Sequence, residues 1–535
     1  MRRHTCRSRL PSSASCRAIC SCIPRGSGST RRALPRAVRP STHEVARGAR
    51  AGSLSRHQRL TLLAAILGSG VATIDGSIVG VALPAIERDL GGGLSAQQWV
   101  SNAYLLALGS LILIGGSLGD IYGERRVFAF GVAAFGILSL LCALAPTMGA
   151  LIAARALQGA AGALVTPSSL AIIVAAFSPS ERGAAVGSWT AWGGIAAIVG
   201  PLAGGSIVDG ISWRWIFALN VPLVLATLAL ILAAVPRSTR ASSRRVDLPG
   251  AGLCVAGLGG FVFALIEEPR HGWGSATIVV PLAGGVAAFA AFIGYERLAL
   301  EPMLRLDLFA RRNFSVGNVE TLSMYAGVAF LFFFLVIYLQ QVAGYDALKS
   351  GLTTVPVTLV MFALSRRSGA LADRLGPRLF MGLGPVIAAA GILLLARVGM
   401  HVSYLTGLLP ALLVFAVGLS LTVAPLTATV LADADEEDAG IASAVNNAVA
   451  RVAGLVGVSV VGVVVAGTLV GDTFAANPES VRAFHHAIFI CAALVAAGGI
   501  VGAIGIANPR RAVEARSCPG GQLVGVPQPA LAKEV

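Results

Sequence analysis

Gly116-Ser-Leu118-Gly-Asp120-Ile-Tyr-Gly123-Glu-Arg125-Arg126 is followed later in the chain by a diverged copy, Gly369-Ala-Leu371-Ala-Asp373-Arg374-Leu-Gly376-Pro-Arg378. The Gly, Leu, Asp and Gly of the two copies fall at the same offsets, 253 residues apart. Each copy follows a long apolar segment and interrupts it with turn residues and charges. A duplicated charged turn between apolar helices is typical of a membrane transporter built from two related halves.

The composition favours an all-α integral membrane protein. Of the 535 residues, 55% are hydrophobic and only 13% are charged, whereas soluble domains contain about a quarter charged residues. Apolar segments of about 20 residues recur, and each is long enough to cross a hydrocarbon layer roughly 30 Å thick. A large soluble helical protein is the alternative. It is excluded because most of these segments are apolar on all sides and have no polar face for water.

The net charge of +15 belongs mainly to the N-terminal tail. Residues 1–59 carry +13 and the rest of the chain only +2, so nucleic-acid binding is not expected. The tail is rich in Arg, Ser and Pro, and it lacks the apolar centre of a secretory signal, which predicts a disordered basic extension. A transit peptide, a polybasic contact with anionic lipid, or a start codon assigned too early are the alternatives.

Cysteine usage predicts neither a disulfide framework nor a metal site. Four of the eight Cys lie in the tail, and their spacing matches no common zinc pattern. No nucleotide-binding Gly-x-x-x-x-Gly-Lys-Ser/Thr loop is present. We therefore expect no metal and no cofactor, and no ATP-driven pumping by this chain alone.

The apolar pattern predicts fourteen transmembrane helices. The expected spans are 60–83, 98–118, 127–146, 149–177, 184–208, 213–235, 248–267, 275–295, 314–342, 350–372, 379–399, 404–431, 440–468 and 484–507. With the N-terminus inside, the inner loops and the C-terminal tail after residue 59 hold 19 Lys and Arg, against six in the outer loops and outer helix ends. The positive-inside rule therefore places both termini in the cytoplasm.

The repeat offset places the second span on the tenth, so spans 1–6 correspond to spans 9–14. Two helices are then inserted between two six-helix bundles. The predicted domains are a tail (1–59), an N-terminal bundle (60–235), the two-helix insertion with its flanking loops (236–313), a C-terminal bundle (314–507) and a C-terminal tail (508–535).

Four further segments stand out in the first half of the chain. They lie in the first, fourth and fifth spans and at the start of the sixth, and they read Asp75-Gly-Ser77-Ile-Val-Gly80-Val-Ala-Leu83-Pro84, Arg155-Ala-Leu-Gln158-Gly159, Gly200-Pro201-x-x-Gly204-Gly205, and Ser212-Trp213-Arg214-Trp215-Ile-Phe217 through Asn220-Val-Pro222.

Together with the duplicated turn, these segments resemble the 14-helix drug:proton antiporters of the major facilitator superfamily (the EmrB/QacA type), over about residues 60–507. The sequence departs from the family pattern at a few positions, which are Ser77 (usually Thr), Gly80 (usually Asn), Ala196 (usually Gly), and Ile121 and Glu124 (usually Arg). The resemblance implies the major facilitator fold and export of small molecules in exchange for protons.

Asp75 is the main candidate for proton coupling. It lies about fifteen uncharged residues into the first span, and a carboxylate in hydrocarbon costs roughly 2.5 kcal/mol or more, so it should face the bundle interior. A carboxyl group withdrawn from water holds a proton more readily. An Asp fixed by its neighbours only for packing is the alternative.

Arg155 is the second candidate, because it does not readily deprotonate and a nearby cation favours the ionised carboxylate. The resemblance implies such a role, and the alternative is an Arg that reaches the outer interface. Glu320 lies a turn or two inside the ninth span, where it could serve protons or substrate, or lie at the inner interface.

The duplicated turns are expected to form a conformational latch on the inner side. Asp120 and Asp373 are expected to cap the inner ends of the second and tenth spans. An acid there is favoured by the dipole of the following helix and can pair with Arg across the seam between the bundles. The remaining latch residues are Arg125, Arg126, Arg374 and Arg378. A static turn with ordinary loop charges is the alternative.

Two more groups complete the candidate sites. Gly200 and Pro201 permit a bend, and Gly204 and Gly205 permit close helix approach, either for antiport or as generic small-residue packing. Arg451, in the thirteenth span, and the preceding Asn446 and Asn447 are candidates for a substrate cavity.

The expected function is proton-driven export of drugs or antibiotics across a bacterial cell membrane by alternating access. The expected partners are a lipophilic small molecule, protons and the bilayer, and the chain is expected to act as a monomer. An exporter or symporter of an endogenous metabolite is the alternative within transport. A membrane sensor that does not transport is another, and a membrane enzyme is disfavoured because no cluster of His, Cys and carboxylates falls within the spans.

Overall fold

A computed structural model describes residues 54–236, 246–434, 439–465, 474 and 476–508. The basic tail up to residue 53, Arg244 and Arg245, the acidic run 435–438 and the C-terminal tail from residue 509 lie outside the described residues. All described helices belong to one compact unit, Ser55–Val535.

Within the described residues, fourteen helical segments are long and apolar enough to cross a membrane, which confirms the predicted fold class. They are α2 (Arg56–Leu90), α3 (Gly93–Tyr122), α4 (Glu124–Ala143), α5 (Met148–Ala176), α6 (Pro179–Gly210), α7 (Arg214–Ala218) with α8 (Asn220–Ala234), α9 (Leu248–His271), α10 (Ala276–Leu298), α11 (Arg312–Gln341), α12 (Ala347–Leu375), α13 (Pro377–Leu394) continued by η2 (Leu395–Arg397), η3 (Tyr404–Leu408) with α14 (Leu409–Ala432), α15 (Ala439–Val465) and α16 (Pro478–Gly505). A short helix, η1 (Leu306–Ala310), precedes α11.

Several helices extend beyond the predicted spans. The first span was expected at 60–83, but α2 begins at Arg56 and ends at Leu90. Apolar periodicity marks only the part of a helix that lies in hydrocarbon, and the polar turns at each end do not register as a span. The sixth span is divided at Leu219 into α7 and α8. Pro222 explains the division, because it has no N–H to donate to the carbonyl of Ala218.

The duplicated turns are made by glycines with positive φ. Gly123 has φ 89° and Gly376 has φ 95°, and each ends one helix and precedes the next. This conformation is accessible to glycine and strained for other residues. Asp120 and Asp373 lie in the last turn of α3 and α12, at the inner ends of the second and tenth spans as expected. The glycine at which the chain reverses follows each Asp three residues later.

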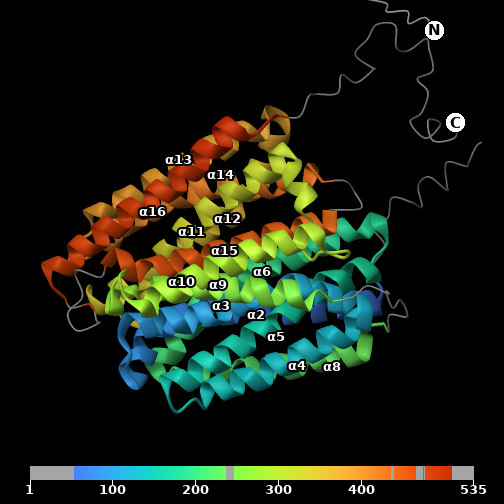
Figure 1. The fold of residues 1–535 in the computed structure, drawn as a ribbon, viewed down its shortest axis with the longest axis horizontal. Coiled ribbons are helices and arrows are strands. Elements are labelled where there is room, and N and C mark those ends of the chain that lie inside the picture. Colours follow the sequence, from blue (N-terminus) through green and yellow to red (C-terminus); the bar gives the residue numbers. More distant parts are fainter. Residues whose placement is uncertain (1–53, 237–245, 435–438, 466–473, 475, 509–535) are drawn as a thin grey trace, which may run out of the picture. The chain divides into compact units, whose positions relative to one another are not determined.

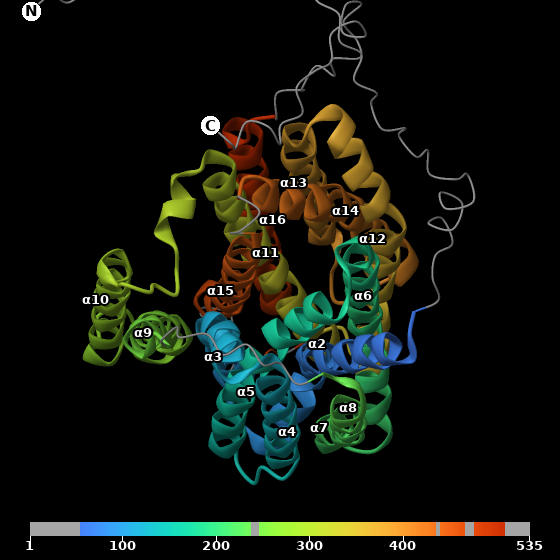
Figure 2. The ribbon, with the colours of Figure 1, turned by 90° about the vertical axis from the view of Figure 1, so that its right-hand side faces the viewer.

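Helix packing produces two six-helix bundles. In the first, α5 packs on α3 and α4, and α2 packs on α6 and α8. In the second, α11 packs on α15 and α16, and α14 packs on α12 and α13. Figure 1 shows the two groups of helices, and Figure 2 shows them from the side.

The inserted helices form a hairpin beside α3 and α15. α9 packs against both of these helices, and α10 packs chiefly against α9. The indole Nε1 of Trp99 on α3 donates to Glu267 Oε1 on α9 at 2.8 Å, and Arg270 donates to the Gly92 carbonyl at 2.8 Å. These bonds fix α9 to α3 of the N-terminal bundle. α10, by contrast, presents most of its apolar side chains outward.

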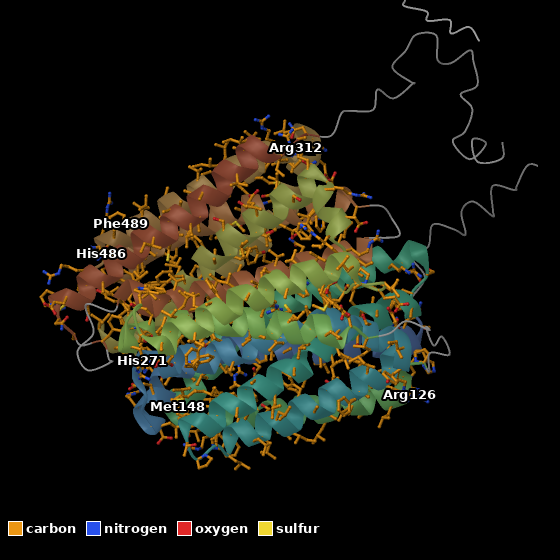
Figure 3. The ribbon with its side chains drawn as sticks, viewed as in Figure 1. Arg126, Met148, His271, Arg312, His486 and Phe489 are labelled. Atoms are coloured by element: carbon orange, nitrogen blue, oxygen red, sulfur yellow. The ribbon has the colours of Figure 1, made fainter. Side chains whose placement is uncertain are left out.

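The two ends of the bundles differ in charge. We call "basic end" the end at which α2 begins, where the turns at Gly123 and Gly376 carry Arg126 and Arg378 and α11 begins at Arg312. The "far end" is the opposite one, where α2 ends and α12 begins. Figure 3 shows Arg126 and Arg312 at one end, and Met148, His271 and His486 at the other.

The bundles meet in their far-end halves. Six hydrogen bonds between described residues of the two bundles all lie there. Gln98 donates to the carbonyls of Val458 and Ser459 at 2.7 and 3.1 Å, and Asn102 donates to Ser459 Oγ at 2.9 Å. Gln340 donates to the Val81 carbonyl at 2.9 Å, and Asp209 accepts the remaining two bonds.

Candidate functional site

Asp75 lies at the centre of a buried polar cluster in the N-terminal bundle. Its side chain is completely buried on α2. Arg155 Nη1 donates to Oδ2 at 2.5 Å, while Gln158 Nε2 and Asn220 Nδ2 donate to Oδ1 at 3.0 and 2.9 Å. One carboxylate thus receives a cation and two amides, from α5 and from the start of α8. The bond from Arg155 is charge-assisted, and such hydrogen bonds are shorter and stronger than neutral ones.

Arg155 is held on all sides. It is 1% exposed, which excludes the alternative of an Arg that reaches the outer interface. Nη1 also donates to Gln158 Oε1 at 2.7 Å, and Nε donates to the Val100 carbonyl at 3.3 Å. The guanidinium lies over the ring of Tyr104, 4.2 Å from its centroid. The ring face attracts the cation, so the positive charge keeps favourable contacts apart from Asp75.

Local helix geometry assembles this cluster. Gln158 is three residues after Arg155 and therefore shares its face of α5. Asn220 begins α8, directly after the break at Leu219, and its Nδ2 also donates to Ser139 Oγ on α4 at 3.0 Å. Ser139 in turn donates to the Phe217 carbonyl at 2.9 Å. Four helices and the division of the sixth span thus position the groups around one carboxylate.

The chemistry available here is exchange of a proton for an ion pair. A buried pair is balanced only while both charges are present, and loss of one partner costs about 3–5 kcal/mol. Protonation of Asp75 removes its charge and leaves Arg155 with the Gln158 oxygen, the Val100 carbonyl and the Tyr104 ring. Titration of one group therefore changes the interactions of α2 with α5 and α8, which is what coupling to conformation needs.

The Gly-Pro segment of α6 contacts both bundles. A Cβ on Gly200 would collide with Ser77, and one on Gly204 with Ile78, both on α2. A Cβ on Gly205 would lie 2.5 Å from the Cα of Leu348 on α12. A Cβ on Gly351 of α12 would in turn lie 2.6 Å from the Pro201 carbonyl oxygen. Gly205 and Pro201 therefore lie on the boundary between the bundles. Generic packing within one bundle does not account for that position.

Two of the predicted latch residues, Arg125 and Arg378, bind within their own bundles in this conformation. Arg125 Nη2 donates to the Leu232 carbonyl at 3.1 Å, and Arg378 Nε donates to the Ala503 carbonyl at 2.5 Å. Asp120 and Asp373 are exposed. Arg126 lies at the basic end, as does Arg374, the basic residue in the last turn of α12. Pairing across the seam stays a prediction for another conformation.

Glu320 is not brought to Asp75. It lies eight residues into α11 and is fully buried in the C-terminal bundle, facing Gly502 of α16. Neither carboxyl oxygen has a hydrogen-bond partner among the described residues. The alternative of an interfacial Glu is wrong, because two turns of helix and three packed helices cover it.

The remaining candidates separate into two environments. Asn446 donates to Asn318 Oδ1 and Thr321 Oγ1, both at 3.1 Å, and so joins α15 to α11 within the C-terminal bundle. Arg451 lies beside Gly109 of α3, where the two bundles meet. Asn447 is exposed. A shared cavity for these three residues stays a prediction.

The sequence motifs alone assign no role to Gln158 and Asn220. Their contacts with Asp75 join residues 83 and 145 positions apart in the chain. A buried amide needs a hydrogen-bond partner, and Gln158 shares a helical face with Arg155, so the sequence does indicate that Gln158 lies near this site. Tyr104, by contrast, occupies an ordinary apolar stretch and had no signal.

Comparison with known proteins agrees with this arrangement. The profile of the Major Facilitator Superfamily matches residues 65–458, most of the chain.

The chain belongs to the major facilitator superfamily.

Relatives in this superfamily match most of the chain. The puromycin resistance protein pur8 of Streptomyces alboniger is 37% identical over 73% of this chain and 78% of its own length. The cephamycin export protein CmcT of Amycolatopsis lactamdurans is 34% identical over 84% and 92% of the two chains. The multidrug resistance protein Stp of Mycobacterium tuberculosis is 34% identical over 76% of each. The resemblance to the 14-helix drug exporters of the superfamily is thereby confirmed.

Solved structures of the superfamily show the same fold. A bacterial homologue of the lysosomal transporter Spinster, in an inward-facing conformation, has a TM-score of 0.59 at 16% identity, and covers 86% of this chain and 100% of that one. A peptide transporter bound to sulfate has a TM-score of 0.61 at 14% identity, over 82% and 93%. At these identities the likeness concerns the fold alone. The protein is therefore a multi-pass membrane transporter with the major facilitator fold.

Proposed function

We propose that this protein exports drug-like small molecules across the bacterial cell membrane in exchange for protons, with Asp75 as the proton site. The observation that carries the proposal is the Asp75 cluster, in which one completely buried carboxylate holds an arginine and two amides. The relatives named for puromycin resistance, cephamycin export and multidrug resistance support the substrate class.

Proton binding is coupled to conformation because the charges of Asp75 and Arg155 compensate each other only while both are present. While Asp75 is ionised, Arg155 is paired with it at 2.5 Å and α2 is bound to α5. When a proton neutralises Asp75, the carboxyl no longer holds the guanidinium, and the relative free energies of the two conformations change. Substrate binding that favours one protonation state is thereby linked to proton uptake or release.

The basic end is assigned to the cytoplasm, with both termini there. Arginines gather at the turns of that end, as the positive-inside rule requires. Because the hydrogen bonds between the bundles lie in the far-end halves, the described conformation is closed to the outside. In the opposite conformation, the duplicated turns with Asp120, Arg125, Asp373 and Arg374 would meet and serve as the latch.

Glu320 is proposed as a separate buried acid of the C-terminal bundle. Burial of a polar group without a hydrogen-bond partner is costly, and neither carboxyl oxygen of Glu320 has one among the described residues. Its distance in the fold from Asp75 gives the protein two ionisable positions, one in each bundle. The Asn446 and Arg451 region, between the bundles and α11, is the proposed lining for the substrate path.

The test measures export and proton movement together. Purified protein in liposomes with an internal pH-sensitive dye is given a panel of lipophilic dyes and antibiotics. Wild type is expected to move protons when a substrate is added, and Asp75→Asn to lose substrate-dependent proton movement. Asp307→Asn is the matched control, because Asp307 is an acid outside the spans that pairs with Arg305. Export by Asp75→Asn that still follows an imposed pH gradient would remove Asp75 from the mechanism.

The same panel addresses the alternative of an endogenous product. Cephamycin export by one relative is the observation that favours it. A single accepted compound, with no movement of unrelated lipophilic dyes, would assign the protein to dedicated export of one product. A non-transporting sensor would bind compounds without moving them or any proton.

A further inference from the structure

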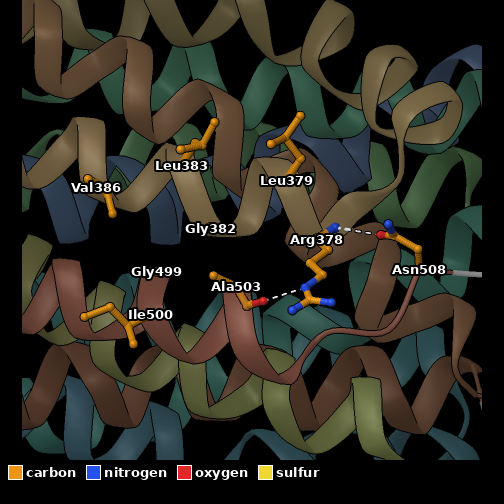
Figure 4. A pocket seen from close by; sticks show the side chains of 9 residues that line it. All are labelled: Arg378, Leu379, Gly382, Leu383, Val386, Gly499, Ile500, Ala503 and Asn508. Carbon is orange, nitrogen blue, oxygen red and sulfur yellow. Dashed lines mark hydrogen bonds between the residues drawn. The ribbon is translucent and has the colours of Figure 1, made fainter.

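A groove of about 420 Å³ lies on the outside of the C-terminal bundle, between α13 and α16. Its apolar part is lined by Gly382, Leu383, Val386, Gly499, Ile500 and Ala503, and Arg378 and Asn508 lie at its basic end (Figure 4). None of these residues belongs to the Asp75 cluster, which lies between α2, α5 and α8. Its volume falls in the range of about 300–1,000 Å³ that small-molecule sites occupy.

Small residues create the floor of the groove. A Cβ on Gly499 would lie 2.9 Å from the Gly382 carbonyl, and a Cβ on Gly382 would lie 2.9 Å from that of Ala503. The two helices therefore approach closely and leave a furrow above their contact. Because the floor has almost no side chains, an elongated apolar group can rest against backbone along a little over one turn of each helix.

The walls of the groove are exposed and apolar. Leu383, Val386 and Ile500 are 53%, 46% and 55% exposed. Contiguous apolar exposure on this scale is unfavourable in water, at about 25 cal/mol per Å². On membrane-spanning helices it is expected to face hydrocarbon instead. A groove that opens sideways into the bilayer is adjacent to acyl chains. These chains are apolar and elongated, as the groove is.

The basic end of the groove offers donors to an anion. Arg378 Nε donates to the Ala503 carbonyl, and its two Nη groups have no acceptor among the described residues. Asn508 Oδ1 accepts from the Arg378 backbone N at 3.1 Å, so the Asn508 amide nitrogen is left as a donor. Figure 4 shows both side chains together at that end. The guanidinium edge matches the geometry of a phosphate.

Neighbouring charges add to this positive end. Arg312 donates to the Gly505 carbonyl at 2.7 Å, two residues beyond Ala503 on the last turn of α16. The end of α12 and the start of α13 together carry one acid, Asp373, and two arginines, Arg374 and Arg378. Capping of the α16 carbonyls explains the Nε bond of Arg378. It does not explain why its other donors border an open apolar furrow.

We propose that this groove binds an anionic phospholipid, with its phosphate on Arg378 and Asn508 and one acyl chain along Gly382, Leu383, Val386 and Gly499. The lipid would lie in the leaflet at the basic end, and its headgroup would share the last turn of α16 with the arginines. This inference is independent of the transported substrate and of proton coupling.

Native mass spectrometry of the purified full chain provides the first test. Protein stripped of lipid is titrated with phosphatidylglycerol, with phosphatidylcholine and with soluble glycerol phosphate. We expect phosphatidylglycerol to remain bound at voltages that remove phosphatidylcholine, and glycerol phosphate not to compete. Equal retention of both lipids overturns the anionic headgroup site, and equal binding of glycerol phosphate overturns the acyl-chain groove.

Paired variants separate the two halves of the site. Arg378→Gln is expected to weaken phosphatidylglycerol binding by about tenfold or more, the effect of losing a hydrogen bond to a charged group. Arg397→Gln removes an arginine at the other end of the same helix and should change nothing. Val386→Trp fills the groove and should reduce binding of any two-chain lipid, whereas Leu393→Trp, exposed on α13 outside the groove, should not. Unchanged phosphatidylglycerol binding by both groove variants overturns the proposal.

Photocrosslinking keeps the test independent of variant folding. Wild-type protein is illuminated with phosphatidylglycerol that carries a diazirine on its acyl chain, and the adducts are mapped by peptide mass spectrometry. The expected adducts fall on peptides that contain 382–386 or 499–503. Adducts spread evenly over the outward-facing helices, such as α10, would mean an unselective lipid belt and would overturn the site.

Discussion

The carboxylate of Asp209, at the end of α6, caps the N-terminus of α12 across the boundary between the bundles, where Leu348 N donates to its Oδ2 at 2.8 Å. Ala347 N donates to Oδ1 at 3.2 Å. Asp346 accepts from Lys349 N at 2.7 Å. The first N–H groups of a helix have no partner within it, so two carboxylates from different bundles satisfy three of them. The closed far end thus depends partly on a helix cap.

Asp209→Ala should favour opening of the far end. Loss of an N-cap costs about 1 kcal/mol, and here that free energy is lost only when the bundles are in contact. Nitroxide labels at Ala150 and His486, at the far end of each bundle, report the change as a larger population of long distances in pulsed electron paramagnetic resonance. Asp346→Ala is the control, because it removes a cap of the same helix that does not cross the boundary. Equal shifts in both variants would contradict the role given to Asp209.

The ionised carboxylate of Asp346 should stabilise the folded protein by an amount that does not change between pH 5.5 and 8.5. The Lys349 backbone N–H, aided by the Lys349 side chain, holds the pKa of Asp346 below its ordinary value of 3.8. A lowered carboxyl pKa stabilises the fold above the unfolded value, near pH 4, and the contribution is lost as the pH falls through the folded value. The difference in melting temperature between wild type and Asp346→Asn should therefore be constant from pH 5.5 to 8.5. A change within that interval would require a different titrating group.

Removal of one charge from the Asp75–Arg155 pair should cost more than removal of both. Arg155→Met leaves a buried carboxylate without its cation and should destabilise the protein by about 3–5 kcal/mol. The double variant Asp75→Asn with Arg155→Met should recover much of that loss, since an amide beside a thioether leaves no buried charge. Thermal unfolding in detergent, followed by tryptophan fluorescence, measures the cycle. Additive losses would mean that the two side chains do not interact as the 2.5 Å contact indicates.

Gly205 and Gly204 should behave differently although they are adjacent. A side chain at 205 meets the backbone of α12, so Gly205→Ala should separate the bundles at the far end and shift the distances measured there. A side chain at 204 meets Ile78 within the same bundle, so Gly204→Ala should lower the melting temperature without that shift. Gly194→Ala is the control, because nothing lies within 4 Å of its Cβ position and alanine is the better helix former.

Glu320→Gln should be tolerated for folding. The carboxyl group has no hydrogen-bond partner among the described residues and lies against Gly502, so an amide of the same size should replace it with little loss of packing. Glu320→Ala, which leaves a cavity, should cost about 2 kcal/mol or more. The melting temperatures of both variants check this. Transport by Glu320→Gln then shows whether the acid also takes part in proton exchange, because only that role requires a titratable group.

The sequence predicted the helices and the single groups better than their partners. The repeated Asp and Gly indicated two related halves, and Gly123 and Gly376 indeed form equivalent turns. Apolar length and charge gave fourteen spans because hydrocarbon imposes both on any chain that crosses it. Asp75 was identifiable for the same reason, since a lone carboxylate in an apolar span has a high cost.

Contacts between helices were less accessible. Periodicity indicates which face of a helix is apolar, but it does not indicate the neighbouring helix, so the positions of Asn220 beside Asp75 and of Gly205 against α12 could not be derived. Glu320 is a similar case. Its span placed it in the C-terminal bundle, but its position against Gly502 of α16 could not be derived from the sequence.

The bonds that join Gln98, Asn102 and Gln340 to the facing bundle have an electrical consequence. Four of the six hydrogen bonds across the boundary involve only uncharged groups. The membrane voltage does work of about 2.3 kcal/mol per elementary charge per 100 mV, and none on a neutral amide. Parting these contacts therefore moves almost no charge through the field. Any current that accompanies turnover should report the cargo and its counter-ion, not the motion of the protein.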